Sequence, residues 1–178
     1  MKSLEQNLTQ YAAYHRDRRN IATHFAGIPM IVFAILLAAT NAWVPLGPLS
    51  LTLAAIVAIA GCIYYFLLDV VFGVTMALVL FVFCAAASEL VARTSAGISL
   101  GIAGVLFAAG WGLQFLGHKF EGMKPAFYDD VAQLLIGPLF VCAEVFFLLG
   151  AKAGLRRFIE ERVGPTVLRD RAHPGVEL

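Results

Sequence analysis

The stretch of sequence that decides the fold is FAGIPMIVFAILLAATNAWVPLGPLSLTLAAIVAIAGCIYYFLL, residues 25–68, which contains no charged residue. A helix needs about 20 apolar residues to cross the hydrocarbon core of a bilayer, so this stretch is long enough for two crossings. Pro and Gly residues gather in its middle, at 43–48, and favour a turn there. The stretch therefore predicts two membrane helices, 23–42 and 49–68, joined by a hairpin turn at the membrane interface.

Three further apolar runs follow, at 70–88, 94–117 and 131–150. The last run is interrupted by Pro138 and Glu144, which makes it a weaker candidate for a simple crossing. All these runs are continuous, whereas the strands of a membrane barrel alternate apolar and polar residues. The sequence therefore predicts an all-α, integral-membrane helical bundle of four to five apolar helices, preceded by a polar N-terminal helix within residues 1–22.

The overall composition agrees with a membrane protein. Of the 178 residues, 60% are hydrophobic and 14% are charged, whereas about 25% of a soluble domain is charged. The net charge of +1 predicts no nucleic-acid partner. Cys62, Cys84 and Cys142 form no CxxC pair, so they indicate neither zinc nor a redox motif. We expect one membrane-embedded domain at 1–160, a polar and irregular C-terminal tail at 161–178, and no cleavable signal.

Lysine and arginine residues set the expected orientation in the membrane. A basic cluster lies in the N-terminal segment and none lies in the first hairpin, which places the N-terminus in the cytoplasm. The fourth apolar helix then ends in the cytoplasm, beside Lys119 and Lys124. A fifth full crossing would put the basic C-terminal segment outside, against the rule. We therefore expect the fifth run either to return or to lie in the interface.

Three histidines gather at one face of the bilayer under this topology. His15 and His24 lie at the start of the first membrane helix, and His118 lies at the end of the fourth. Neutral imidazole is a common ligand of iron, zinc and copper. Glu121 follows His118 at the i, i+3 spacing that puts two side chains on one helix face, as in the iron sites of helix bundles. These residues are candidates for a metal site, with plain interfacial polar residues as the alternative.

The spacing between His15 and His24 requires a break in the helix. Nine residues make about 2.5 turns, so on one straight helix the two rings would point to opposite sides. The polar residues 16–20 lie between them, and Asn20 is a good N-cap residue. We therefore expect a bend or break in this segment that lets the two imidazoles converge.

Other polar residues border or interrupt the apolar runs. Gln114 lies one turn before His118 and could hydrogen-bond to a metal ligand. Glu144 lies within an apolar run, where a carboxylate needs a partner. The arginines among residues 16–19 indicate either binding to lipid headgroups or docking of a substrate carboxylate. His173, in the polar tail, is expected to be solvated.

Longer motifs contain these candidates. The first is Y-H-x4-N-x3-H-x2-G-I-P, which starts at Tyr14, and the second is W-x2-Q-F-x-G-H-x2-E, which starts at Trp111. A third, G-P-L-F, starts at Gly137 and precedes Glu144. With these motifs the sequence resembles, over residues 4–150, the family of iron-dependent 2-hydroxy fatty acid dioxygenases, whose members act in fatty acid α-oxidation, including phytosphingosine breakdown.

The resemblance implies a membrane enzyme that uses Fe(II) and molecular oxygen to shorten a 2-hydroxy fatty acid by one carbon. It assigns His15, His24 and His118 to the metal and catalytic site and adds Glu121 as a catalytic residue, without settling which of the four contact iron. The same motifs contribute further residues that are expected beside the cofactor, namely Asn20, Gln114 and Glu144.

The chemistry is compatible with a site at the membrane edge. A 2-hydroxy acid can chelate iron through its hydroxyl and carboxylate groups if the ion keeps open positions. The acyl chain would then lie among the Phe-rich helices while the acid head meets the metal. Basic residues of the same face could hold the carboxylate by charge-assisted hydrogen bonds. The candidates for this role are Arg16, Arg19, Lys119 and Lys124.

Two other functions stay open from the sequence alone. Two of the histidines could be axial ligands of a haem in an electron carrier, or the chain could be a lipid-binding membrane protein without catalysis. For the enzyme we expect a 2-hydroxy fatty acid and the lipid bilayer as partners. We expect its active site on the cytoplasmic face of a bacterial inner membrane or, alternatively, of the endoplasmic reticulum. No sequence pattern indicates an oligomeric state.

Overall fold

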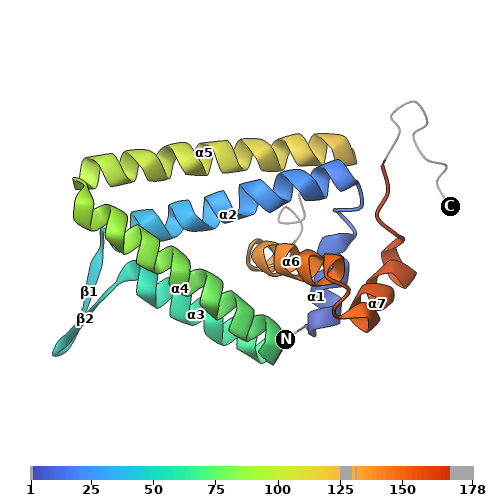
Figure 1. Cartoon of the computed structure of the whole chain (residues 1–178), viewed down its shortest axis with the longest axis horizontal. Coiled ribbons are helices and arrows are strands. Elements are labelled where there is room, and N and C mark those ends of the chain that lie inside the picture. The colour runs from blue at the N-terminus through green and yellow to red at the C-terminus, as the bar shows by residue number, and fades with distance from the viewer. Residues whose placement is uncertain (1, 125–129, 131, 169–178) are drawn as a thin grey trace.

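Helices account for most of the chain (Figure 1). The computed structural model describes residues 2–124, 130 and 132–168. Within them the elements are, in chain order, α1 (Leu4–Ala12), α2 (Arg18–Thr40), β1 (Trp43–Leu46), β2 (Leu49–Thr52), α3 (Leu53–Leu68), α4 (Val70–Arg93), α5 (Ala96–Glu121), α6 (Gln133–Leu148) and α7 (Ala153–Val163). The predicted all-α class is confirmed apart from the short hairpin β1–β2.

Helices α2 and α5 run side by side, and small residues make their contact close (Figure 1). On α5 the buried small residues Ala103, Gly110 and Gly117 recur every seven positions, which places them on one face. A β-carbon added at Gly110 would lie 2.9 Å from the carbonyl oxygen of Gly27, and one at Gly117 would lie 2.4 Å from Oδ1 of Asn20. The two helices are therefore antiparallel, and the N-terminus of α2 lies beside the C-terminus of α5.

The turn after α2 is a β-hairpin. Strands β1 and β2 pair antiparallel, with Trp43 opposite Thr52 and Leu46 opposite Leu49. The expectation of a helix that starts at residue 49 is wrong, because strand pairing satisfies the backbone N–H and C=O groups of this segment instead. Helix α3 begins only at Leu53, where the hydroxyl of Thr52 accepts a hydrogen bond of 3.2 Å from the backbone N–H of Ala55.

Helices α3 and α4 form a second pair, joined at Asp69. The Asp69 carboxylate accepts a hydrogen bond of 3.0 Å from the backbone N–H of Phe72 and so caps α4. It also forms an ion pair of 2.8 Å with Nζ of Lys152, in the turn between α6 and α7. This contact places the α3–α4 turn beside the C-terminal helices.

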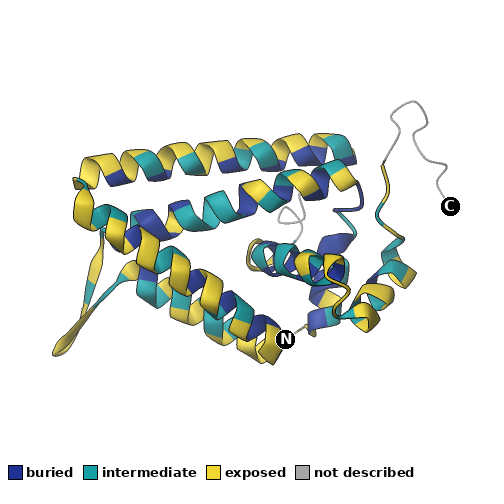
Figure 2. Cartoon of the chain, viewed as in Figure 1, coloured by how far each residue is buried: buried dark blue, intermediate teal, exposed yellow. Residues whose placement is uncertain are grey.

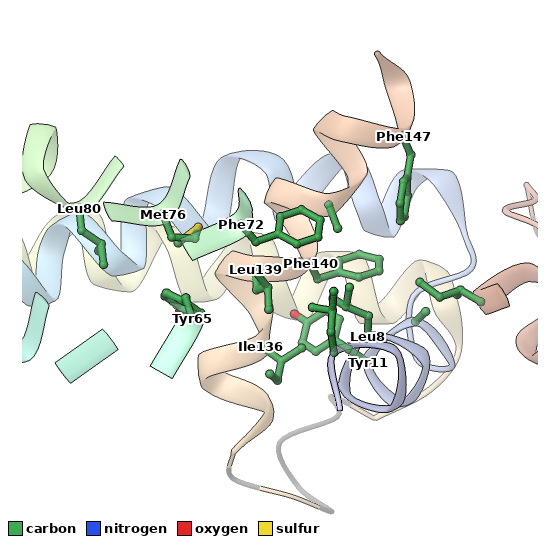
Figure 3. Packing of buried hydrophobic residues seen from close by; sticks show 14 of the residues in the cluster. Leu8, Tyr11, Tyr65, Phe72, Met76, Leu80, Ile136, Leu139, Phe140 and Phe147 are labelled. Atoms are coloured by element: carbon green, nitrogen blue, oxygen red, sulfur yellow. The ribbon is translucent and has the colours of Figure 1, made fainter. Parts of the chain in front are cut away.

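Helices α1 and α6 pack against α3 and α4 around the main apolar core (Figure 3). Leu8 and Tyr11 of α1 contribute buried side chains to it, as do Phe72 of α4 and Phe140 of α6. The hydroxyl of Tyr65, on α3, donates a hydrogen bond of 2.9 Å to a backbone oxygen of α6. The core thus joins the N-terminal helix to segments from the middle and the end of the chain.

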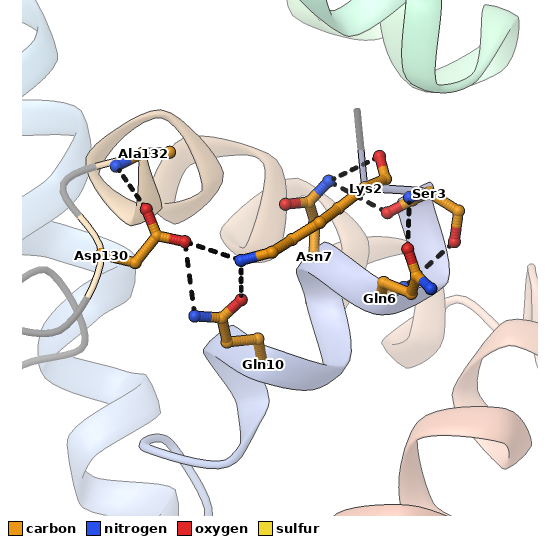
Figure 4. Close-up of polar contacts among 7 residues, drawn as sticks. All are labelled: Lys2, Ser3, Gln6, Asn7, Gln10, Asp130 and Ala132. Atoms are coloured by element: carbon orange, nitrogen blue, oxygen red, sulfur yellow. Dashed lines mark hydrogen bonds and ion pairs between the residues drawn. The ribbon is translucent and has the colours of Figure 1, made fainter.

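Polar contacts fix helix α1 (Figure 4). Ser3 and Gln6 form a capping box, in which each side chain accepts a hydrogen bond from the other residue's backbone N–H. The ammonium group of Lys2 lies 2.8 Å from a carboxylate oxygen of Asp130 and 2.7 Å from Oε1 of Gln10. These contacts hold the residue that precedes α6 beside α1.

The fifth apolar run is not one simple crossing. Helix α6 ends at Leu148, and α7 leaves it at 113°. Beyond α7, the backbone of Val167 accepts a hydrogen bond of 2.9 Å from Arg18 and donates one of 2.8 Å to Arg16. Because Asp130 contacts α1 and Val167 contacts the start of α2, both flanks of the α6–α7 pair lie at the same end of the molecule. The bent pair is either a broken span or a re-entrant loop, so the expected return of the run stays a prediction.

The C-terminal tail differs in part from the expectation. An irregular end was expected at 161–178, but α7 continues to Val163 and Val167 forms a parallel bridge with Asp17. Backbone pairing orders this segment although its side chains are polar or exposed. His173 and its neighbours at 169–178 lie outside the described residues. The domain boundary at 160 stays a prediction.

Apolar surface on the long helices suggests membrane association (Figure 2). Among the described residues, α2, α4 and α5 are long and apolar enough to cross a membrane, and the bent α6–α7 pair makes a fourth if it counts as one span. Helix α3 is a shorter apolar helix. Large apolar side chains such as Phe81, Val105 and Ile63 are exposed on these helices, where lipid would cover them. The expected four to five membrane helices are thus confirmed only in part.

We expect Gly110→Ala to destabilise the protein. The new β-carbon would lie 2.9 Å from the Gly27 carbonyl oxygen and 2.7 Å from Cγ1 of Ile31, so the two helices would have to separate. Such overpacking typically costs about 1–3 kcal/mol. Gly112→Ala is the matched control, because its β-carbon would meet open space and alanine favours a helix. Thermal unfolding of both variants in detergent should show a lower midpoint for Gly110→Ala alone, and equal midpoints would contradict the close contact.

Candidate metal centre

A break between two helices brings His15 to His24. Helix α1 ends at Ala12 and α2 begins at Arg18, and Nε2 of His15 lies 3.0 Å from Nε2 of His24. The predicted break is therefore confirmed. Its expected cap is wrong: the residue that caps α2 is Asp17, whose carboxylate accepts a hydrogen bond of 2.8 Å from the backbone N–H of Arg19.

The close contact between α2 and α5 brings His118 to the same point. Its ring centroid lies 4.8 Å from that of His15 and 5.2 Å from that of His24. One ligand atom from each of the three residues lies within 4.8 Å of the other two, and all three side chains are buried. The predicted convergence of the three imidazoles is present, whereas their role as ligands is a matter for experiment.

The hydrogen bonds of two imidazoles fix their protonation. Nδ1 of His15 lies 2.7 Å from the backbone oxygen of Tyr11, and Nδ1 of His24 lies 2.9 Å from that of Asn20. A carbonyl oxygen only accepts hydrogen bonds, so each Nδ1 carries the proton of a neutral ring. Burial, reinforced by His24, lowers the pKa of His15 well below its usual value, which keeps this ring neutral. Both Nε2 atoms therefore present lone pairs to each other.

Two facing lone pairs in a buried site are what a cation binds. Two nitrogens that bind one ion at about 2.1 Å each lie at most about 4.2 Å apart, and the separation of 3.0 Å satisfies this limit. Nδ1 of His118 is buried and has no hydrogen-bond partner among the described residues. Imidazole nitrogens suit iron, zinc and copper, and three of them leave coordination positions for other ligands. The residues therefore fit a metal ion.

Glu121 holds the break rather than completing the triad. Its carboxylate accepts hydrogen bonds from the backbone N–H groups of Arg16, at 3.0 and 3.1 Å, and Asp17, at 2.8 Å. It also accepts one of 2.9 Å from the side-chain amide of Asn20. The end of α5 is thereby fastened to the residues directly after His15. These contacts engage the carboxylate of Glu121 in the fold, and its predicted role as a catalytic residue stays a prediction.

Comparison with known proteins identifies the family of the chain. A family model described as "2-hydroxy-palmitic acid dioxygenase Mpo1-like" matches residues 1–149. The chain belongs to the Mpo1-like family. The 2-hydroxy-palmitic acid dioxygenase MPO1 of Saccharomyces cerevisiae is 29% identical to it over 161 residues, which cover 88% of this chain and 87% of the yeast protein. No solved structure matches the chain.

Other predicted residues of this Mpo1-like protein lie around the triad rather than in it. Gln114 is buried on α5, and its amide nitrogen occupies the space that a β-carbon at Gly27 would fill. Glu144 lies on α6 and lines a cavity of about 510 Å³ together with Arg16 and Arg156. The carboxylate expected to need a partner therefore faces arginines, and its predicted place beside the cofactor stays untested.

The arginines expected to bind a substrate carboxylate are engaged in the fold. Arg16 donates hydrogen bonds to the backbone oxygens of Ala12, His15 and Gly164, at 2.9 to 3.0 Å. Arg19 forms a two-point ion pair with Asp17, at 3.0 and 2.7 Å. Both side chains thus stabilise the break between α1 and α2. The corresponding role of Lys119 and Lys124 stays a prediction.

Sequence reasoning missed Tyr11 and Phe140. The ring of Tyr11 stacks on His15, with centroids 4.1 Å apart and planes 3° from parallel, while the backbone oxygen of Tyr11 orients the same imidazole. The ring centroid of Phe140 lies 5.6 Å from that of His15. The i, i+4 spacing of Tyr11 and His15 could have revealed the first contact. Nothing in the sequence relates Phe140, on α6, to the site.

We expect Glu121→Gln to destabilise the protein and to weaken its metal binding. The amide would turn a donor towards the backbone N–H groups of Arg16 and Asp17, which would leave buried donors unsatisfied. The loss of hydrogen bonds to a buried charged group costs about 1.5–3 kcal/mol. The matched control is Glu89→Gln, because Glu89 forms an exposed ion pair with Arg93, and such pairs contribute about 0–1 kcal/mol.

Thermal unfolding of the metal-free variants, followed by titration with Fe(II), measures both effects. Glu121→Gln should unfold at a lower temperature than Glu89→Gln and bind Fe(II) more weakly. If the two variants behave alike, Glu121 does not hold the histidines in place.

Proposed function

We propose that this protein is an Fe(II)-dependent dioxygenase that shortens 2-hydroxy fatty acids by one carbon. The observation that carries the proposal is the buried pair of Nε2 lone pairs on His15 and His24, 3.0 Å apart, beside His118. Membership of the Mpo1-like family, together with the name of the yeast relative, supports the substrate class. The exposed apolar faces of the long helices support a lipid environment for such a substrate.

The residues of the chain have separate tasks in this proposal. His15, His24 and His118 would hold the metal ion. When bound, Fe(II) would supply the redox chemistry by which dioxygen oxidises the hydroxyl-bearing carbon to a carboxylic acid; the bond to the old carboxyl carbon breaks, and the reaction balances when that carbon leaves as CO2 and the second oxygen atom leaves as water. The backbone oxygens of Tyr11 and Asn20 keep the Nδ1 protons in place, so the Nε2 atoms stay free to bind. The burial of the imidazoles excludes bulk water from the site.

The position of the site supports an active site on the cytoplasmic face. The basic N-terminal residues Arg16, Arg18 and Arg19 surround the break between α1 and α2, and the basic helix α7 lies at the same end of the molecule. By the positive-inside rule, this end faces the cytoplasm. The head of an amphiphilic acid lies at the same level, where the membrane meets water.

The geometry favours a non-haem site over a haem carrier. Two axial nitrogens bind a haem iron from opposite sides at about 2 Å each, so they lie about 4 Å apart with the macrocycle between them. The Nε2 atoms of His15 and His24 are only 3.0 Å apart, and the three ring centroids lie 4.5 to 5.2 Å from one another. A porphyrin would have to separate the packed rings.

We expect about one Fe(II) ion per chain and a higher unfolding temperature once iron is bound, because a ligand that binds only the folded state stabilises it. His15→Ala, His24→Ala and His118→Ala should each lose the bound iron, whereas His173→Ala, in the C-terminal tail, should retain it. Metal analysis and an optical spectrum check this result. A Soret band would favour the haem carrier, and substoichiometric metal in the parent protein would favour a lipid-binding protein without catalysis.

We expect the Fe(II)-loaded protein, supplied with a 16-carbon 2-hydroxy acid and oxygen, to form the 15-carbon acid. Each triad variant should lower this activity by at least about 100-fold, because outer partners alone typically change metal affinity or activity by about 10–100-fold. Mass spectrometry of the extracted acids measures the product. Product formation by all three triad variants at the parent's rate would exclude this site.

A further inference from the structure

An apolar cavity of about 260 Å³ lies between α2, α5 and α6. Ile31 and Ile35 of α2, Phe107 and Trp111 of α5, and Leu134 of α6 contribute to its walls. The lining residues Ile35, Phe107 and Leu134 are also exposed on the apolar outer surface, at 44%, 43% and 48%. The cavity is therefore accessible from the side of the molecule that faces lipid.

Two glutamines place polar groups in this apolar cavity. Gln114 and Gln133 both line it, and their side chains are buried, with 6% and 1% exposed. Nε2 of Gln114 has no hydrogen-bond partner among the described residues, and the Gln133 amide interacts with the Asp130 carboxylate without a hydrogen bond of normal geometry. Buried amides almost always have full sets of partners, so two incompletely partnered amides in one cavity indicate a polar ligand group.

Gln114 lies at the end of the cavity near the histidines. Gln114 is one turn from His118 along α5, about 6 Å along the helix axis. Tyr11, whose ring stacks on His15, lines the same cavity. The opposite end is apolar: Ile35 is eleven residues from His24 and Phe107 is eleven residues from His118, or about 16 Å along either helix. The cavity therefore has a polar end at the metal centre and an apolar end within the bilayer.

The distance from the histidines to the apolar end of the cavity fits a long acyl chain. With carbon–carbon bonds of about 1.5 Å, an extended alkyl chain advances about 1.25 Å per carbon, so about 16 Å from the metal centre to this end accommodates roughly 13 carbons. An uncharged amide offers both donors and an acceptor, which matches a head that carries a carboxylate and a hydroxyl group. A two-chain phospholipid has a larger head and a second chain, and it fits these features less well.

We propose that this cavity binds the acyl chain of the substrate and that Gln114 and Gln133 hydrogen-bond its 2-hydroxy-carboxylate head. The inference rests on the proposed function for the identity of the ligand. It adds the location of the acyl chain in the protein. It also makes the two glutamines the residues that distinguish a 2-hydroxy acid from an unsubstituted acid. Gln133 belongs to none of the motifs that carry the family resemblance.

A fluorescence experiment tests binding without turnover. Trp111 lines the cavity, and the only other tryptophan, Trp43, lies on the hairpin and is exposed. In metal-free Trp43→Phe protein, a 16-carbon 2-hydroxy acid with two bromine atoms on its acyl chain should quench the fluorescence of Trp111. The quenching should saturate as the concentration of the acid rises. The brominated acid without the hydroxyl group should bind about tenfold more weakly.

The glutamine variants decide what the head contacts. In Gln114→Leu and Gln133→Leu, the affinities for the two brominated acids should come within about twofold of each other. The absence of saturable quenching, retained discrimination in both glutamine variants, or equally strong quenching by a brominated phospholipid would overturn the inference.

A chain-length experiment locates the apolar end. Val32 lines the cavity eight residues from His24, about 12 Å along α2, so phenylalanine there leaves room for about ten carbons. In Val32→Phe, kcat/KM for the 16-carbon acid should fall at least tenfold and that for the 8-carbon acid less than twofold. Val82→Phe is the control, because Val82 is exposed on α4 away from the cavity. Equal effects on both acids would overturn the inference.

The two experiments separate this inference from the proposed function. If the parent protein turns over no 2-hydroxy acid, the proposed function fails, and the quenching of Trp111 alone decides whether the cavity binds one. If turnover occurs without quenching or a change in chain-length preference, the function stands and the cavity is not the chain site. Should Val32→Phe not fold, Ile35→Phe takes its place at about 16 Å and should spare a 12-carbon acid.

Discussion

The close approach of α2 and α5 is the constraint on which the rest of this structure depends. Backbone meets backbone where Gly110 faces Gly27, and Gly117 leaves room for the side chains of Asn20 and Thr23. In a membrane, helices gain little from hydrophobic burial, so close packing and hydrogen bonds must hold them together. This contact brings His24 and His118 to one level and lets Glu121 reach the residues after His15.

The buried triad is unfavourable without a positive charge. Each Nε2 of His15 and His24 has lost its water, while its Nδ1 is committed to a backbone oxygen. Two such lone pairs at 3.0 Å repel each other, and protonation of a ring is opposed by its burial. The fold holds this arrangement together through Glu121 and the stacked ring of Tyr11. Binding of a cation removes the conflict, which gives the site an electrostatic reason for taking up metal.

The arrangement of α6 gives the site its relation to the bilayer. Both flanks of the α6–α7 pair lie at the end that carries the histidines, α6 packs on α1 and α2, and its Phe140 lies beside His15. Helix α6 closes one side of a cavity whose polar end is at the triad and whose apolar end is reached from lipid. An amphiphile in a membrane has the same polarity along its length, so it could bind there without leaving the bilayer.

Much of this protein could be predicted from local sequence patterns. Continuous apolar runs predict helices wherever they are long enough, and the nine-residue spacing of His15 and His24 requires the break that the structure shows. The convergence of His118 with them also follows from the order of the membrane crossings. Each of these conclusions depends on the periodicity of the helix or on whether the number of membrane crossings between two residues is odd or even. Both can be counted from the sequence alone.

Contacts between distant segments could not be predicted in this way. The hairpin β1–β2 replaces the expected start of a helix at residue 49, Asp17 caps α2 in place of Asn20, and the carboxylate of Glu121 binds backbone N–H groups. The place of Gln133 in one cavity with Gln114 depends on how α6 packs. The sequence by itself determined which segments are helical and which residue types can bind a metal. Only the tertiary structure decided which partners the polar groups find, because a buried donor or acceptor pairs with whatever the packing brings within about 3 Å.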